Sequence, residues 1–235
     1  SFTTSEVYDT SYYDGFGDAA FSAWTKEGTP SRSTELVRTG SYSYVLDEAK
    51  EGLTMNFDEP QKNVVTLWVY DDMGKGDFDT AVAAVRGDGF NTVMGVRCHR
   101  DPTNGSKDYY AYRVGAKFVA TTVPRTLGWH ELKWDYTSGT KCEMYIDDQL
   151  IYTVEGVEGF TQIWMGDAWA DGGSGEVSGM AFDDLSIGDP VLEPIPTGIS
   201  LNLQELTIKA GGKLQDIEAL LETDIDIPME LEWSS

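Results

Sequence analysis

The chain has 235 residues, with 17 Lys and Arg against 40 Asp and Glu, which gives a formal net charge of −23. Such a charge argues against duplex DNA or an anionic membrane as a partner, because basic side chains supply most of the affinity for phosphate. No run approaches the ~18 apolar residues of a membrane helix, and two cysteines cannot staple a fold of this size. The length suits one β-rich domain with a large core plus a smaller appendage.

Residues Ser1 to Thr10 lack the basic segment and apolar core of a signal peptide, so the sequence is interpreted as a mature or excised piece. The following 180 or so residues alternate apolar and polar side chains with a period of two, separated by turn residues, and no helix is expected before residue 190. This pattern predicts an all-β fold, an antiparallel β-sandwich of the jelly-roll type. The predicted strands are Val64–Tyr70, Thr80–Arg86, Thr92–His99, Tyr109–Val114, Lys117–Val123, His130–Tyr136, Lys141–Ile146, Gln149–Val154 and Gly179–Ile187.

Both cysteines fall in predicted strands and alternate with apolar neighbours. Cys98 follows Met94 and Val96, and Cys142 precedes Met144, so both side chains are predicted to point into an apolar layer. Cysteine commonly behaves as a small core hydrophobe, and we expect two buried free thiols. A disulfide between them stays open as the alternative.

Three prolines within seven residues, ending at Pro196, fix φ and favour an extended spacer. We therefore predict a first domain at 1–189, a linker at 190–197 and a second segment at 198–235. In that segment the alternation from Ile199 to Lys209, the Gly211-Gly212 turn and the terminal Trp233-Ser234-Ser235 resemble the first strands of a bacterial Ig-like group 2 domain, here incomplete. A short amphipathic helix through Leu214, Ile217, Leu220 and Leu221 is the alternative.

Three stretches between residues 2 and 189 resemble known families. The Asp14–Asp18 element, followed by Trp24 and by Arg38–Leu46, looks like the opening of bacterial carbohydrate-binding modules of the jelly-roll type. The Gly128–Leu132 segment with Met144–Leu150 is similar to the G-W-H and Y-I-D-G pair of laminin-G and concanavalin-like domains, with Asp148 in place of the usual Gly. Phe182–Ile187 resembles the closing strand of such modules.

The resemblance to carbohydrate-binding modules implies a structural Ca²⁺ held by Asp14 and Asp183. In the predicted last strand, Ala181, Asp183, Leu185 and Ile187 share one face, which would direct a carboxylate toward the core. A buried carboxylate costs several kcal/mol unless it is paired or binds a metal, and calcium prefers oxygen ligands. The alternative is that Asp183 accepts hydrogen bonds from a turn.

One window departs from the acidic background: between Arg86 and Arg125, basic residues outnumber acidic ones by four. If Met94, Val96 and Cys98 face the core, Arg97 and His99 face the open surface of a sheet, which is commonly the polysaccharide groove in a jelly roll. A solvated face that balances nearby acids is the alternative interpretation.

Aromatic rings cover the apolar faces of sugars, and planar groups such as Arg bind their hydroxyls and carboxylates. Trp68 and Tyr70 have a parity opposite to Leu67 and Val69 and are expected to project outward as stacking platforms. Trp24 and Trp129 are expected in the core. The predicted ligand-binding residues are Trp68, Tyr70, Arg97, His99, Tyr110, Tyr112, and Trp164 and Trp169 in a Gly-rich rim.

The favoured function is a non-catalytic polysaccharide-binding module of a secreted bacterial glycan-degrading enzyme, joined to other domains of that enzyme, with an acidic polysaccharide as the candidate ligand. The sequence lacks G-x-S-x-G, H-E-x-x-H and a phosphate-binding glycine loop. One alternative is a jelly-roll polysaccharide lyase that uses Arg97, His99 and Tyr112. Another is an adhesion module at the cell surface. All three interpretations place the protein outside the cell and predict no nucleic-acid or membrane partner.

Overall fold

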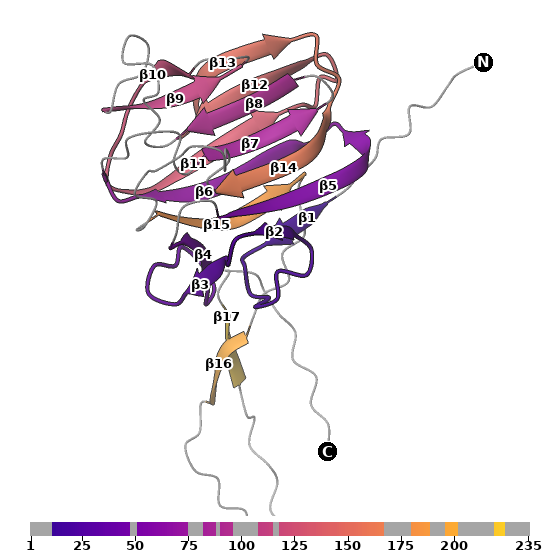
Figure 1. Ribbon diagram of the computed structural model, residues 1–235. Coiled ribbons are helices and arrows are strands. Elements are labelled where there is room, and N and C mark those ends of the chain that lie inside the picture. Colours follow the sequence, from indigo (N-terminus) through magenta and orange to yellow (C-terminus); the bar gives the residue numbers. More distant parts are fainter. Residues whose placement is uncertain are drawn as a thin grey trace, which may run out of the picture. The chain divides into compact units, whose positions relative to one another are not determined.

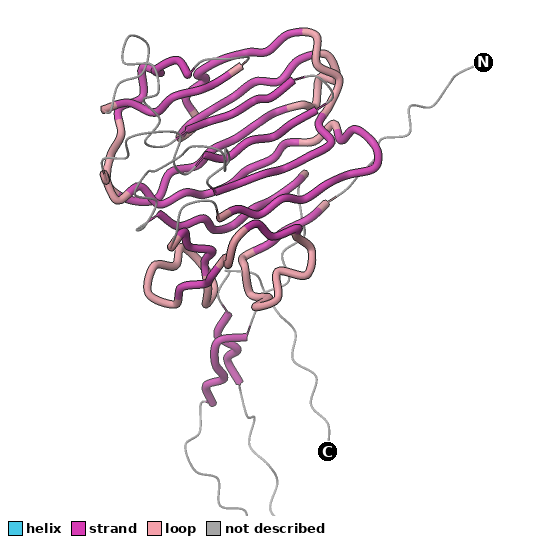
Figure 2. Tube along the Cα trace, in the orientation of Figure 1, coloured by secondary structure: helices cyan, strands magenta, loops and turns pink. Residues whose placement is uncertain are grey.

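The computed structural model describes residues 11–47, 51–74, 82–87, 90–95, 108–114, 118–166, 180–188, 196–201 and 219–223. Within these ranges the regular elements are strands, and no helix is present (Figure 2). The described residues therefore contain no helix that is long and apolar enough to cross a membrane. The chain forms two compact units, Ser1–Pro190 and Val191–Ser235.

The first unit contains fifteen of the strands assigned within the described ranges. They are β1 (Tyr12–Asp14), β2 (Thr25–Glu27), β3 (Ser31–Ser33), β4 (Ser43–Leu46), β5 (Gly52–Gln61), β6 (Val64–Asp71), β7 (Val82–Gly87), β8 (Phe90–Gly95), β9 (Tyr109–Arg113), β10 (Phe118–Pro124), β11 (Gly128–Asp135), β12 (Lys141–Ile146), β13 (Gln149–Glu155), β14 (Phe160–Gly166) and β15 (Met180–Ile187).

These strands form two antiparallel sheets that pack face to face (Figure 1). Sheet A has the order β13-β12-β11-β6-β15-β4-β3, with β1 also paired to β15. Sheet B has the order β10-β9-β8-β7-β14-β5-β2. Some strands that are adjacent in a sheet are distant in sequence, such as β6 and β15, because several connections cross from one sheet to the other. The predicted antiparallel β-sandwich is confirmed.

The core lies between the sheets because each strand buries every second residue. In β6, Val65, Leu67 and Val69 are at most 1% exposed, whereas their neighbours are partly exposed. Sheet B contributes Leu53, Met94 and other alternating residues to the same cluster. Each fully buried large apolar side chain contributes roughly 1.5–3 kcal/mol, so the alternation itself drives the two sheets together.

The predicted strands correspond to β6–β13 and β15, within two residues at the ends that the structure describes. The sequence does not predict β5 and β14, which pair with each other between β7 and the edge strand β2 of sheet B. The residues of β14 were interpreted as part of a Gly-rich rim. Their true position, between β7 and β5, changes the location of Trp164.

Cys142 is a free thiol with no exposed surface, as predicted. Burial raises the pKa of this thiol to about 12, so it stays protonated and unreactive at neutral pH. Cys98 lies outside the described residues.

The second unit contains an antiparallel pair, β16 (Pro196–Leu201) and β17 (Ala219–Thr223). β16 begins inside the range predicted as a linker. Leu220 and Leu221 lie in β17, so the alternative of an amphipathic helix is wrong for these two residues. Leu214 and Ile217 lie outside the described residues, and the resemblance to an Ig-like domain stays a prediction.

Candidate functional site

The predicted ligand-binding residues do not converge on one hollow. Trp68 and Tyr70 lie on the outer face of sheet A, the side away from the core, as their parity predicted. Tyr110 has no exposed surface and belongs to the core between the sheets, so its assignment as a surface residue is wrong. The reason is cross-strand register: Tyr112 pairs with the buried Met94, which places Tyr110 and Tyr112 on the inner side of sheet B.

Tyr112 lies where the two sheets meet at an open edge. Its ring stacks on Tyr152 of β13, with centroids 4.4 Å apart and an interplanar angle of 20°. This pair closes the edge of the sandwich, so both rings are used for packing between the sheets. Arg97, His99 and Trp169 lie outside the described residues.

Trp164 projects from the outer face of sheet B, but it is only 3% exposed. It packs in a small apolar cluster that is separate from the main core, with Ala84, Val93, Ala111 and Phe118. Cross-strand partners share a side of the sheet, and Trp164 pairs with Ala84, which in turn pairs with Val93. Trp164 is therefore a buried residue on the outer side of sheet B, and it does not form part of an exposed Gly-rich rim.

A row of planar polar side chains lies beside this cluster on the same outer face. Arg86 of β7 places its guanidinium carbon 3.9 Å from the centre of a Trp164 ring. Arg86 Nη1 donates to Gln162 Oε1 at 3.2 Å, and Gln162 Nε2 donates to Asn56 Oδ1 at 2.8 Å. Three adjacent strands thus align an Arg, a Gln and an Asn at the same level of the sheet.

The row borders an open, polar hollow of about 600 Å³. Asn56, Gln162 and Arg86 line one part of it, and Asp58 and Glu59 line another. Arg86 Nε is buried and has no hydrogen-bond partner among the residues that the structure describes. Since Nε itself has no contact with solvent, Arg86 lines the hollow with the rest of its side chain, and its guanidinium makes no ion pair within the described residues.

Two neighbouring charges shape this guanidinium. Burial is the main cause that lowers the pKa of Arg86, and the nearby charge of Arg113 acts in the same direction. Glu27 opposes both. The group stays protonated because arginine titrates far above neutral pH. The outer face of sheet B therefore carries a partly desolvated positive charge in a strongly acidic protein.

Two other bases of the positive window are described: Arg113, whose guanidinium carbon lies 5.6 Å from the centre of the Phe118 ring, and Arg125, which serves the fold. Arg125 forms a buried two-point ion pair with Asp71, with Nε to Oδ2 at 2.8 Å and Nη2 to Oδ1 at 2.6 Å. Its Nη2 also donates to the carbonyl of Gly74 at 3.1 Å. Arg125 therefore fixes the chain that leaves β6 and takes no part in the hollow.

The outer face of sheet A carries exposed aromatic rings. Tyr70 and Trp129 are register partners on β6 and β11, and their rings meet edge to face with centroids 5.5 Å apart. Trp129 is partly exposed, so the prediction that it packs in the core is wrong. Trp24, only 7% exposed, is in the core as expected. The Arg38 guanidinium covers one side of Trp68, with its carbon 3.6 Å from the ring centre.

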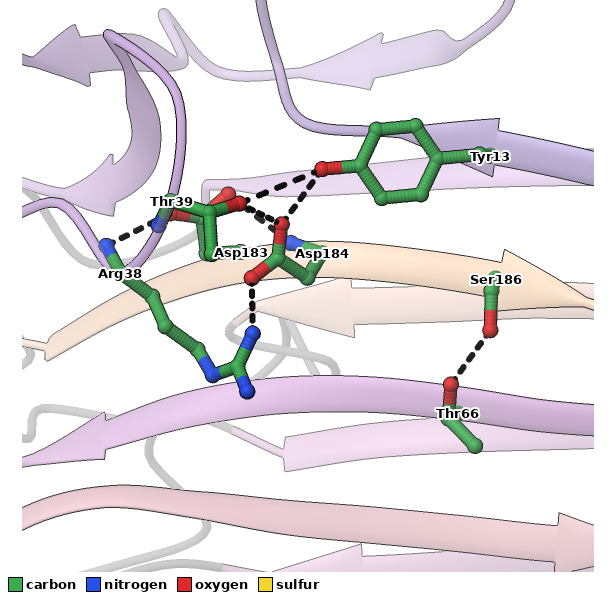
Figure 3. Close-up of polar contacts among 7 residues, drawn as sticks. All are labelled: Tyr13, Arg38, Thr39, Thr66, Asp183, Asp184 and Ser186. Carbon is green, nitrogen blue, oxygen red and sulfur yellow. Dashed lines mark hydrogen bonds and ion pairs between the residues drawn. The ribbon is translucent and has the colours of Figure 1, made fainter. Parts of the chain in front are cut away.

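A latch of two adjacent carboxylates holds the segment around Arg38 against sheet A (Figure 3). Asp183 Oδ2 accepts the backbone amides of Arg38 at 2.8 Å and Thr39 at 3.4 Å. Asp184 accepts the Tyr13 hydroxyl at 2.5 Å, the Thr39 hydroxyl and the Arg38 guanidinium. This latch connects β1, β15 and the segment before β4.

Asp183 does not share a side with Leu185, contrary to the alternation expected for the last strand. Asp183 pairs with Trp68 and Ser186 pairs with Thr66, so Asp184 and Leu185 together oppose Leu67. Asp184 adopts a left-handed conformation with φ of 48°. This β-bulge shifts the alternation by one residue, so that Leu185 and Ile187 face the core while Asp183 faces outward.

A calcium ion shared by Asp14 and Asp183 does not fit these residues. Asp14 pairs with the buried Leu185, on the opposite side of the sheet from Asp183. Its oxygens accept the Phe16 amide and the Trp24 indole N–H, both at 2.7 Å. The described residues contain no group of three or more His, Cys, Asp or Glu placed to hold a metal. Asp183 instead follows the alternative, hydrogen bonds from a turn, and calcium binding elsewhere in the chain stays a prediction.

The residues predicted from the sequence to bind a ligand do not include Asn56, Gln162 or Arg86. A signal was present, because T-M-N in β5 and Q-I-W in β14 alternate polar or aromatic residues with apolar ones. The pairing of these two strands, 106 residues apart at Asn56 and Gln162, is what brings the polar positions together.

No protein-family model matches the sequence, and no curated protein is significantly similar to it. Similar solved structures include domain 4 of AbnA, a GH43 extracellular arabinanase from Geobacillus stearothermophilus, in complex with arabinotriose (14% identity, TM-score 0.47, 71% of this chain and 78% of that chain). They also include the carbohydrate esterase vb_24B_21 from the Shiga toxin-encoding bacteriophage phi24B (11% identity, TM-score 0.49, 73% and 92%) and the Crh5 transglycosylase (12% identity, TM-score 0.49, 78% and 85%). At such low identity, function has to be inferred from this chain's own residues.

Proposed function

We propose that this protein is a non-catalytic polysaccharide-binding module that binds an acidic glycan on the outer face of sheet B. The observation that carries the proposal is the state of Arg86. Its guanidinium is stacked on Trp164, has no ion-pair partner within the described residues, and is held by a hydrogen bond to Gln162 at the lining of an open hollow. A uronate carboxylate supplies the opposite charge and the hydrogen-bond acceptors for this guanidinium.

The rest of the hollow suits the hydroxyl groups of the same sugar. Asn56 and Gln162 offer both donors and acceptors, and Asp58 and Glu59 offer acceptors only. These acidic side chains repel a ligand with a high density of charge, whereas a polymer with one carboxylate per sugar places its remaining hydroxyls against them. The mixed lining therefore favours a sugar acid over an inorganic anion.

We also propose that the module acts outside a bacterial cell as part of a larger enzyme. A protein with this many acidic side chains and a binding face for uronate polymers suits the outside of a bacterial cell, joined to further domains of a glycan-degrading enzyme. In this role the module holds the polymer near a catalytic domain. The described residues offer no observation that favours the lyase or the adhesion alternative.

Isothermal titration calorimetry with polygalacturonate and alginate tests the binding site. We expect Arg86→Gln to weaken binding at least tenfold, because a hydrogen bond to a charged group is worth about 1.5–3 kcal/mol. Arg32→Gln is the matched control, since Arg32 also lies over an aromatic ring, 4.0 Å from the centre of Tyr42, but not at this hollow. Wild-type affinity in Arg86→Gln would refute the site.

Two further measurements test the ligand class and the absence of catalysis. Binding of the acidic polymers should weaken several-fold between 50 and 500 mM salt, because exposed charge pairs are screened over ~8 Å or less. Binding at this hollow that is independent of salt and restricted to neutral glycans would refute the proposal that the ligand is an acidic polysaccharide. Incubation with alginate, pectin and xanthan should produce no unsaturated ends by ultraviolet absorbance, and their appearance would favour a lyase.

A further inference from the structure

The outer face of sheet A contains a carboxylate that the fold does not use. Glu131 of β11 is partly exposed, and its side chain has no hydrogen-bond or ion-pair partner in the part of the chain that the structure describes. The two nearby cations are committed elsewhere. Lys133 pairs with Asp148 at 2.9 Å, and Arg38 pairs with Asp184.

Aromatic rings surround this carboxylate on the same face. Trp68 is the register partner of Glu131 on β6, and Trp129 lies two positions before Glu131 on β11. Tyr70 is the register partner of Trp129. Opposite residues lie about 5 Å apart across strands and residues i and i+2 about 7 Å apart along a strand, so the three rings and the carboxylate fit within the outline of one sugar ring and its substituents.

The chemistry of this group of residues selects an uncharged, hydroxyl-rich ligand. Burial raises the pKa of Glu131, which reflects a carboxylate that is partly removed from solvent and has no donor within the described residues. A cationic ligand is disfavoured by Arg38 and Lys133, whose charges already act on Glu131. An anionic ligand is disfavoured by Glu131 itself and by Asp148. A neutral sugar supplies hydroxyl donors to the carboxylate and C–H faces to the rings.

We infer that the outer face of sheet A carries a second binding site, for an uncharged sugar whose ring stacks on Trp129 beside Tyr70 and whose hydroxyls donate to Glu131. The site lies on the opposite side of the sandwich from Arg86 and shares no residue with the hollow on sheet B. It is independent of the proposed function, because each site stands on its own side chains.

Affinity electrophoresis in gels that contain barley β-glucan, wheat arabinoxylan or galactomannan tests this inference. We expect retardation of the wild type by at least one of these neutral polymers, unchanged in 500 mM salt. Glu131→Gln should weaken binding at least fivefold, because the amide offers a single acceptor oxygen. Glu143→Gln is the matched control: Glu143 lies on neighbouring β12 but is paired with Lys141 at 2.7 Å.

Trp129→Ala should abolish the retardation. The melting temperature of this variant shows whether it is folded. If Trp129→Ala does not fold, Glu131→Gln still tests the site. Arg86→Gln should bind the neutral polymers as the wild type does, even if the acidic glycan site fails its own test. No retardation of the wild type in all three gels overturns the inference. Equal retardation of the wild type and Glu131→Gln overturns it as well.

Discussion

The two outer faces of the sandwich differ in how they treat their largest aromatic side chains. On sheet B, Trp164 is buried in an apolar cluster and covered on one side by Arg86, which leaves planar polar groups as the accessible chemistry. On sheet A, Trp129 and Tyr70 stay partly exposed around an unpaired Glu131. Within the described residues, one face therefore presents a guanidinium without an ion-pair partner, and the other presents a carboxylate among aromatic rings. The two outer faces of the same sandwich thus differ in the charge of the group that they offer to a ligand.

The sharpest way to break this comparison is to remove one tryptophan from each face. We expect Trp164→Ala to lower the free energy of unfolding by about 3–5 kcal/mol, as for other buried aromatic residues. Trp129→Ala should cost only about 1–2 kcal/mol because part of its ring is in contact with water, unlike that of Trp164. Urea denaturation of both variants measures the difference. Equal losses would show that both faces are covered to the same degree.

The latch beside Trp68 makes the stability of the protein depend on pH. Burial raises the pKa of Asp183 to about 6, above its usual value of about 3.9. The folded protein therefore holds this proton more tightly than the unfolded chain, and the free energy of unfolding falls as the pH rises from about 4 through 6.

This contribution amounts to about 1 kcal/mol between pH 5 and pH 7. Asp183→Asn should lose less stability than the wild type over that interval, by this amount, in urea denaturation at both pH values. The comparison uses the two slopes, since the amide also loses one hydrogen-bond acceptor at every pH. Parallel slopes would show that Asp183 titrates as an ordinary carboxyl group.

The smallest expected effect is that of chelation. Since Asp14 and Asp183 lie on opposite sides of sheet A and accept N–H donors, EDTA should shift the melting temperature by less than about 1 °C at this pair. A calcium ion bound at a hundred times its dissociation constant would add about 2.7 kcal/mol, or roughly 5–10 °C for a domain of this size. A shift of that size that is lost in Asp183→Asn would overturn the conclusion about this pair, whereas a shift that the variant keeps would indicate a structural calcium ion elsewhere in the chain.

The sequence predicted the strands well and the faces only in part. Alternation in β6 correctly placed Trp68 and Tyr70 outward, because that strand is regular and one of its sides is buried. The same reasoning failed for Tyr110. Its orientation follows from pairing with β8, and the register between two strands separated by a long connection is not encoded in either strand alone.

The position of Trp164 shows a second limit. Its segment is rich in glycine and reads as a loop, yet it forms β14 because β5 and β7 supply partners on both sides. Tertiary context of this kind overrides local composition in sheets. The hollow next to Arg86 depends on this pairing, and for that reason sequence reasoning located the positive window but not the residues that complete it.

The bulge at Asp184 has a consequence for mutational tolerance. Phe182, Leu185 and Ile187 all reach the core only because one extra residue separates the first two. Deletion of Asp184, the extra residue of the bulge, would leave a regular strand in which Leu185 opposes Leu67 and Ile187 still opposes Val65. This deletion should therefore keep the core side chains in place and remove only the contacts of the Asp184 carboxylate with Tyr13, Thr39 and Arg38. Deletion of Ser186 should cost more stability, because it turns Ile187 away from the core.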